Sequence, residues 1–147
     1  KSILSTGSPL SDDTFNFLNK KINKSSPIHS ISGGTDIVSC FMLGNPMKPV
    51  FKGEIQSPGL GMDIDVFDDR GFPTRKTGEL VCKSPFPSKP IYFWNDRNNK
   101  KYQSAYFTKY INIWSHGDFV KKTDKPKGSQ KSPWLGIVVI LSSSTLP

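Results

Sequence analysis

The opening of the chain restricts its fold more than any other feature, because the first 36 residues follow the order strand, loop, helix, strand and glycine loop. Ile3–Ser5 is a short β-prone stretch, and Ser11 can cap a helix after it. Phe15, Leu18 and Ile22 recur at helical spacing, which predicts a surface helix with one apolar stripe packed on a sheet.

A second strand-like stretch at 28–32 runs directly into the glycine loop "GGTD" at 33–36. The whole order predicts a βα unit of an α/β protein, and ligands of open parallel sheets bind beyond the carboxyl ends of the strands. The loop "GSP" at 7–9 and the glycine loop both occupy such ends. They are the first candidates for a binding site, with a helix-entry turn and a simple glycine turn as the alternatives.

From residue 52 the pattern changes to the alternation of a β-strand. Apolar residues at 62, 64 and 66 alternate with two aspartates, and a turn at 68–71 leads to a return strand at Glu79–Cys82. This part of the chain is expected to form an antiparallel β module.

Proline and aromatic residues shape the end of that module. Three prolines at 84–90 exclude a central strand, and the strand-like "INIW" at 111–114 leads into the loop "SHGDF". We expect a βα portion at 1–51, an antiparallel β portion at 52–120 and a basic tail at 121–147.

Cysteine use and hydropathy bear on the cellular setting. Cys40 and Cys82 stand far apart without metal-ligand spacing, so two free, buried thiols in a reducing compartment, the cytosol, are expected. The longest apolar run, at 134–141, is far shorter than the ~20 residues that span a bilayer, so no membrane contact is expected. Because Lys1 leads straight into a strand-like stretch, we expect an excerpt of a longer protein.

Positive charge is concentrated late in the chain. Residues 97–131 carry 9 Lys or Arg against 2 Asp or Glu, whereas residues 1–96 carry 11 against 10. Such a stretch can contact phosphates, which keeps nucleic-acid binding as an alternative, but a solvated loop explains it more simply.

The glycine loop combines groups that can hold a phosphate and a metal ion. Gly33 and Gly34 carry no Cβ, so their backbone N–H groups can approach an anion. The Thr35 hydroxyl can donate to a phosphate oxygen, and the Asp36 carboxylate can hold Mg²⁺. A turn that needs glycine, or a helix that starts at this threonine, would be the structural alternatives.

Asp118 follows a glycine in "HGD", and its carboxylate can accept hydrogen bonds from both hydroxyls of a ribose. A plain turn residue is the alternative. His116 is expected to be a packed or capping residue. A serine hydrolase is disfavoured, because the chain has no GxSxG motif and neither His29 nor His116 has a convincing nucleophile.

Three segments in this order, "STGSP", "SISGGTD" and "SHGDF", resemble the adenine, phosphate and ribose loops of the adenylate-forming ligases. The stretches "SISGGTDIVSCFMLGNPMKPVFKGEIQSPGLGMDIDVFD" and "SAYFTKYINIWSHGDF" resemble one branch of that superfamily, the acetoacetate-CoA ligases. The resemblance covers residues 2–120. It implies that residues 1–120 form the C-terminal part of the large N-terminal, AMP-binding domain.

The resemblance also implies a set of nucleotide-binding residues: Gly7, Ser8, Pro9, Gly33, Gly34, Thr35 and Asp118. Within this set, the loop at 7–9 would line the adenine pocket and Asp118 would bind the ribose. Thr35 and Asp36 would serve the chemistry at the phosphate end, where Asp36 would place Mg²⁺.

The implied activity is an ATP-dependent ligase that joins acetoacetate to coenzyme A through an acyl-adenylate. The family's upstream phosphate loop, hinge and lysine-bearing small domain are not recognisable in these 147 residues, so we expect this chain alone to be inactive. Two alternatives from other classes are a non-catalytic remnant or interaction module, and a basic nucleic-acid-binding domain.

Overall fold

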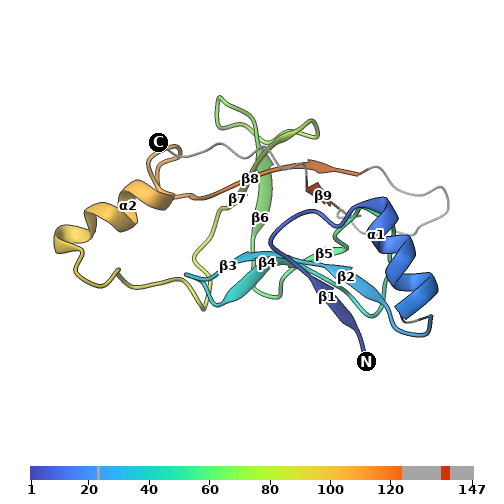
Figure 1. Ribbon diagram of the computed structural model, residues 1–147. Helices are drawn as coiled ribbons and strands as arrows, with labels where there is room; N and C mark the ends of the chain where they lie inside the picture. Colours follow the sequence, from blue (N-terminus) through green and yellow to red (C-terminus); the bar gives the residue numbers. More distant parts are fainter. Residues whose placement is uncertain (23, 124–136, 140–147) are drawn as a thin grey trace.

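The computed structural model describes residues 1–22, 24–123 and 137–139, and within them short strands form three sheets (Figure 1). The first sheet is a parallel pair, β1 (Ile3–Ser5) and β2 (Ile28–Ser30). They are joined through helix α1 (Asp12–Phe17) and a π turn at Leu18–Ile22. The predicted βα unit and the α/β class are therefore confirmed.

Helix α1 begins where local chemistry predicts. The backbone of Ser11 is extended, and its hydroxyl accepts a hydrogen bond from the Thr14 backbone N–H at 3.2 Å. The predicted apolar stripe is covered only in part, because Phe15 and Leu18 are half-buried and Ile22 is 61% exposed. The helix therefore packs more loosely than its stripe predicts.

The second sheet is antiparallel and contains β3 (Ser32–Gly34), β4 (Ser39–Leu43) and β5 (Ser57–Pro58). The predicted single strand at 28–32 with a glycine loop after it is wrong, because β2 ends at Ser30 and both glycines lie within β3. Close approach of two backbones is the reason. A Cβ on Gly33 would lie 2.2 Å from the Ser39 carbonyl oxygen, so only glycine fits.

The third sheet is antiparallel, with β6 (Ile64–Phe67), β7 (Gly78–Cys82), β8 (Trp114–Lys122) and β9 (Ile137–Val139) in that order. Strands β6 and β7 confirm the two strands predicted from alternation, and the Gly71 N–H donates to the Asp68 carbonyl in the predicted turn. No strand forms at 84–90, as the prolines predict.

Strand β8 differs from its prediction. The structure has turns at 111–113, where a strand is predicted, and its strand covers the predicted loop at 115–119. Asp118 therefore lies inside β8. The pairing of β8 with β7 is irregular between Glu79 and Val81, and Gly117 has a φ of +89° there. A bulge and a turn both favour glycine at positive φ, so the sequence pattern does not separate them.

Helix α2 (Lys100–Tyr106) lies within the predicted β portion and is not predicted by the sequence pattern. The Asp96 carboxylate accepts hydrogen bonds from two backbone N–H groups of the first turn, at 2.9 and 2.8 Å. Asn98 and Asn99 have positive φ directly before it, so a polar turn passes straight into a helix. Helices α1 and α2 lie at opposite ends of the molecule (Figure 1).

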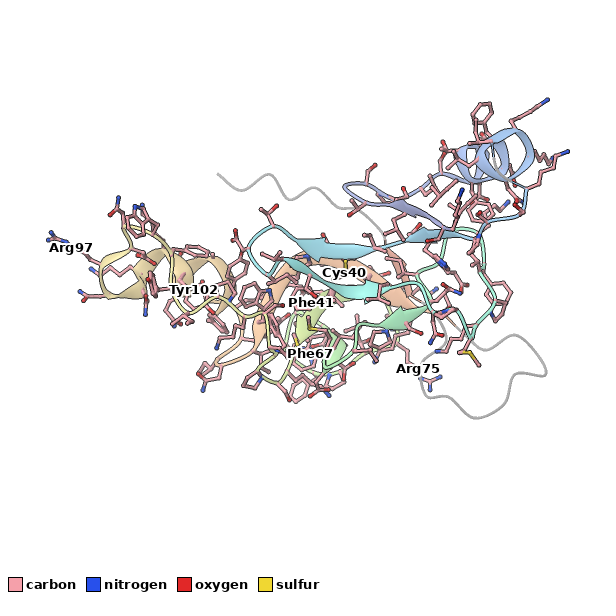
Figure 2. All side chains as sticks on the ribbon, turned by 90° about the horizontal axis from the view of Figure 1, so that it is seen from below. Cys40, Phe41, Phe67, Arg75, Arg97 and Tyr102 are labelled. Carbon is pink, nitrogen blue, oxygen red and sulfur yellow. The ribbon has the colours of Figure 1, made fainter. Side chains whose placement is uncertain are left out.

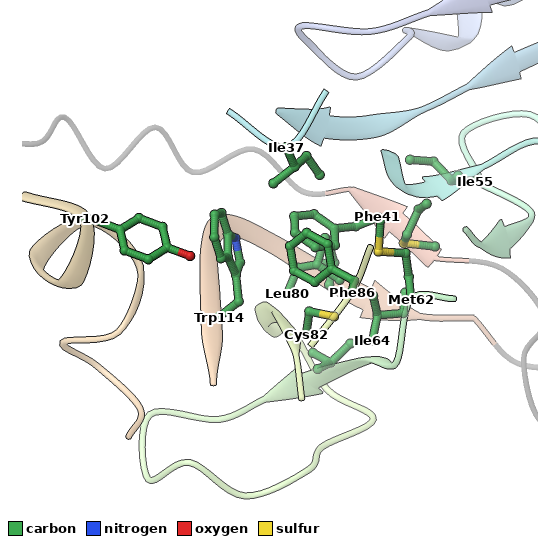
Figure 3. Close-up of a cluster of buried hydrophobic side chains, with 13 residues drawn as sticks. Ile37, Phe41, Ile55, Met62, Ile64, Leu80, Cys82, Phe86, Tyr102 and Trp114 are labelled. Atoms are coloured by element: carbon green, nitrogen blue, oxygen red, sulfur yellow. The ribbon is translucent and has the colours of Figure 1, made fainter. Parts of the chain in front are cut away.

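The main hydrophobic core lies between the second and third sheets (Figures 2 and 3). Its buried members are Ile37, Phe41, Met42, Ile55, Met62, Ile64, Val66, Leu80, Cys82, Phe86, Tyr102, Trp114 and Val120. Aromatic rings meet edge to face within it, as Phe41 does with Phe86 at a centroid distance of 5.3 Å. Neither β1 nor α1 contributes a buried side chain.

A buried hydrogen-bond network fixes β2 to the rest of the molecule. The His29 ring nitrogen Nδ1 lies 2.7 Å from the Gln56 side-chain oxygen, and both residues are buried. The Gln56 amide nitrogen also donates to the carbonyl groups of Lys48 and Pro49, at 2.8 and 2.9 Å. A histidine singled out in the sequence thus has a structural role.

Several further predictions can be placed on the structure. Cys40 and Cys82 are free thiols, as predicted, but only Cys82 is buried and Cys40 is half-buried; burial raises the pKa of both. In the part of the chain that the structure describes, no helix is long and apolar enough to cross a bilayer. Strand β5 lies beyond residue 52 yet pairs with β4, so the second sheet draws on both predicted portions. Most of the apolar run at 134–141 lies outside the described residues.

Candidate functional site

A cavity of about 300 Å³ opens where the loops after β1 and β2 meet strand β8. Residues 6–10, 30–33 and Asp118 line it, together with Gly53 and Ile55. The cavity therefore lies at the carboxyl ends of two parallel strands, the position that open parallel sheets use for ligands. Five of the predicted site residues line it: Gly7, Ser8, Pro9, Gly33 and Asp118.

The loop after β1 provides one wall of the cavity. Gly7 has a φ of +85°, and a Cβ placed on it would meet nothing within 4 Å. Its backbone conformation favours glycine, and no lack of space demands it. Pro9 fixes the chain before Ser11 caps α1. The short loop thus connects β1 to the cap of α1 and lines the cavity between them.

Asp118 is the only ionisable side chain among the described residues that line the cavity. Its side chain is 30% exposed, and its Oδ2 accepts a hydrogen bond of 2.8 Å from the Ser32 hydroxyl on β3. A cavity with one carboxylate and no basic group suits a neutral ligand with hydroxyl donors. The cavity around Asp118 is therefore better suited to a sugar than to a phosphate.

His116 shares a face of β8 with Asp118, because alternate residues of a strand point the same way. Its Nε2 lies 3.6 Å from Asp118 Oδ2, and its ring packs edge-on against Phe41 at a centroid distance of 4.8 Å. Burial lowers the pKa of His116 below its usual value, against the opposing effects of Asp118 and the Gly33 backbone. The ring is therefore neutral at pH 7 and forms a packed support for the carboxylate.

The other predicted residues do not line the cavity. Gly34 lies at the end of β3, and Thr35 and Asp36 lie exposed on the turn that connects β3 to β4. The Tyr106 hydroxyl, at the end of α2, donates a hydrogen bond to Asp36 Oδ2. Burial, together with this carboxylate, raises the pKa of Tyr106. The site thus has two parts, a cavity and an exposed acidic turn.

The acidic turn fits the predicted metal ion in one respect. Mg²⁺ usually keeps several waters and binds through one or two carboxylates plus substrate phosphates. Asp36 is an exposed carboxylate, and the described residues contain no cluster of three or more acidic, histidine or cysteine side chains. A cation held by Asp36 and completed by a phosphate ligand is compatible with this geometry.

Sequence reasoning missed Ser32 and Tyr106, the partners of the two carboxylates. Ser32 and Asp118 are 86 positions apart, and Tyr106 and Asp36 are 70 apart. The only signal for Ser32 is its place directly before the two glycines, and Tyr106 lies on a helix that the pattern does not predict.

The loops at the ends of β1 and β2 and Asp118 line one cavity, which is the placement that the resemblance to the adenylate-forming ligases implies. The chain is homologous to a segment of one group of these enzymes, the acetoacetyl-CoA synthetases. No protein-family model matches it. The resemblance found in the sequence is confirmed by comparisons with both curated proteins and solved structures.

Among curated proteins, acetoacetyl-coenzyme A synthetase of Rhizobium meliloti (strain 1021) is 57% identical over 120 residues, covering 81% of this chain and 18% of that protein. The Gallus gallus acetoacetyl-CoA synthetase is 49% identical over 128 residues, covering 86% and 19%. The structure of acetoacetyl-CoA synthetase from Streptomyces lividans matches with a TM-score of 0.78 and 39% identity, over 95% of this chain and 21% of that chain. The chain thus spans about a fifth of the length of these relatives.

Proposed function

We propose that residues 1–120 form the adenosine-binding part of an ATP-dependent acetoacetate-CoA ligase. One observation carries the proposal: the cavity brings the loop at 7–9, Gly33 and Asp118 together at the carboxyl ends of β1 and β2. The loop supplies a backbone surface for the adenine, and the Asp118 carboxylate accepts hydrogen bonds from the ribose diol.

In the proposed reaction, an acetoacetate oxygen attacks the α-phosphorus of ATP, and the bond to pyrophosphate breaks. The thiol of coenzyme A then attacks the acyl carbon, and AMP leaves. Catalysis of this kind depends mainly on positioning and on stabilising charge. The described residues serve the first of these tasks, because the cavity holds the nucleoside while its phosphates extend toward the acidic turn.

Thr35 and Asp36 are the proposed residues of the phosphate end. The Thr35 hydroxyl donates to a phosphate oxygen, and the Asp36 carboxylate holds Mg²⁺, which neutralises phosphate charge when bound. Their exposure on the turn beside β3 supports this role, since a phosphate chain must leave the cavity to react.

Two of the nine basic residues at 97–131, Lys109 and Lys122, pair with acids of the protein itself, which weakens the case for nucleic-acid binding at these two positions. Lys109 pairs with the buried Glu79, and Lys122 and Lys83 pair with the buried Asp65. These lysines neutralise the protein's own acids.

Two free thiols are consistent with the proposed cytosolic location.

The decisive experiment replaces Asp118 by Asn in the full-length protein that carries this segment. Asn keeps the shape but converts one acceptor into a donor, so one ribose hydroxyl loses its partner. A hydrogen bond to a charged group contributes about 1.5–3 kcal/mol, so kcat/KM for ATP should fall by about 10- to 150-fold. The penalty for 2′-deoxy-ATP should shrink in the variant, because the lost hydroxyl no longer has its acceptor.

The control is the stability of the variant, followed by thermal unfolding. If Asp118 were only a turn or strand residue, Asn would lower the melting temperature and leave the ratio of kcat/KM for ATP to that for 2′-deoxy-ATP unchanged. An unchanged ratio in a folded variant would refute the ribose assignment.

A further inference from the structure

The geometry around Asp118 points to a second residue on which nucleotide discrimination depends. Asp118 belongs to β8 in the third sheet, and Ser32 belongs to β3 in the second sheet. Their side chains meet across the cavity wall, where the Ser32 hydroxyl donates to Asp118 Oδ2 at 2.8 Å. The hydrogen bond thus connects the two sheets at the wall of the cavity.

We infer that Ser32 is a positioning residue that fixes the Asp118 carboxylate for recognition of the ribose. This inference rests on the proposed function of Asp118. Ser32 is only 6% exposed, so water does not easily replace its hydroxyl as a partner. The side chain also lines the cavity, which brings the hydrogen bond within the space that the sugar would fill.

The direction of the hydrogen bond determines what remains for the ligand. Ser32 donates to Oδ2, and the His116 ring approaches the same oxygen at 3.6 Å, beyond hydrogen-bonding distance. The hydrogen bond from Ser32 therefore holds Oδ2, and this fixes the rotation of the Asp118 carboxylate about the bond to its Cβ. Once that rotation is fixed, the spacing of its two oxygens can match two adjacent hydroxyls without further ordering.

Gly33 explains why serine at 32 is so firmly placed. A Cβ on Gly33 would lie 2.2 Å from the Ser39 carbonyl oxygen and 2.7 Å from Cys40 Cα, so the glycine lets β3 and β4 approach closely. Ser32 itself pairs with Met42, which is buried in the core. The Ser32 hydroxyl thus belongs to a strand that packs against the core, and it holds Asp118 within the irregular stretch of β8.

The test uses Ser32→Ala in the full-length protein and measures the ratio of kcat/KM for ATP to that for 2′-deoxy-ATP. Without its partner the carboxylate can rotate, so the ratio should fall by about three- to tenfold, less than for Asp118→Asn because the acceptor is still present. Dissociation constants of AMP and 2′-deoxy-AMP, measured by calorimetry, should converge in the same way.

Ser57→Ala is the matched control. Ser57 is also 6% exposed and belongs to the same sheet, but its hydroxyl accepts from the Asn45 side chain and does not line the cavity. It should lose a similar amount of thermal stability with an unchanged ratio. Ser32→Cys keeps the size with a weaker donor, so the ratio should fall partway even if the alanine variant does not fold.

Three outcomes separate the inference from the proposed function. A fall in the ratio for both Ser32→Ala and Asp118→Asn supports the inference. A fall for Asp118→Asn alone, with Ser32→Ala and Ser32→Cys behaving like Ser57→Ala, overturns the positioning role and leaves the ribose assignment intact. An unchanged ratio in all variants overturns both.

Discussion

The hydrogen bond between Tyr106 and Asp36 gives a sharp test of the acidic turn. Tyr106→Phe removes the hydroxyl that donates to Asp36 Oδ2. It keeps the ring, which stacks on Trp114 at a centroid distance of 3.7 Å and an interplanar angle of 16°. The change therefore frees the carboxylate while the aromatic packing around α2 is preserved.

The expected magnitude follows from exposure. A hydrogen bond to a charged group contributes about 1.5–3 kcal/mol when buried, but Asp36 is exposed and water can replace the lost donor. We therefore expect Tyr106→Phe to lose about 0.5–1.5 kcal/mol of transition-state stabilisation in adenylation, which lowers the rate about 2- to 12-fold. The rate measured is pyrophosphate release from ATP and acetoacetate. The Mg²⁺ concentration that gives the half-maximal rate should rise by a similar factor.

The assay compares Tyr106→Phe with Tyr102→Phe in the full-length protein. Tyr102 lies on the same helix, but its hydroxyl donates to the Pro90 carbonyl at 2.8 Å and does not contact Asp36. Absorbance titration provides a readout independent of activity. Burial, together with the Asp36 carboxylate, raises the pKa of Tyr106, so its titration at raised pH should be absent from Tyr106→Phe and present in Tyr102→Phe, which loses a different tyrosine whose pKa burial raises. Equal Mg²⁺ dependence of the two variants would refute the reasoning.

Three more predictions concern the remaining groups. The purified 147-residue chain should release no pyrophosphate from ATP, acetoacetate and coenzyme A, and steady release would contradict the expectation that this chain alone is inactive. In the full-length protein, Asp36→Ala should slow adenylation much more than thioester formation from added acyl-adenylate. Thr35→Val should raise the activation free energy of adenylation by about 1–3 kcal/mol. Wild-type adenylation rates in both variants would mean that these two residues only form a turn. Burial alone would raise the pKa of Asp65, but hydrogen bonds from Lys122 and the Val66 N–H hold it below its usual value. Its charge therefore adds stability above its unfolded pKa of about 3.9, and this stability is lost as pH falls through the lower folded pKa. In acid unfolding of the 147-residue chain, followed by circular dichroism, stability should fall less steeply with pH below about pH 4 in Asp65→Asn than in the unchanged chain. Parallel unfolding curves for the two would contradict the stabilising role of the charged Asp65.

The features that could be predicted from sequence are those fixed by neighbours in the chain. Ser11 caps α1 through an N–H three residues away, strand β6 follows from alternation, and the turn at 68–71 indicates that β7 returns alongside it. The candidate cavity was partly predictable for the same reason, since the loop at 7–9 directly follows β1.

The features that could not be predicted depend on distant contacts or on ambiguous glycines. The sequence pattern predicts Gly33 as a loop residue, but glycine is required there because β3 approaches β4 closely. Gly117 reads as a turn, but its positive φ belongs to an irregular stretch of β8. The pairing of Asp118 with Ser32 needs both sheets to be assembled first, so no local pattern indicates it.

The shallow burial of the βα unit has a thermodynamic consequence for ligand binding. Strand β1 contributes no buried side chain, and Leu4, Phe17 and Ile22 are 56–62% exposed. Segments with few buried contacts open with lower free energy than the core, so amide protons of β1 and the loop at 6–10 should exchange faster than those of β7. A nucleoside that contacts this loop and Asp118 at once bridges the loosely held unit to the rigid third sheet. Binding and local ordering are then linked, and slower amide exchange in β1 on adding AMP would report occupancy directly.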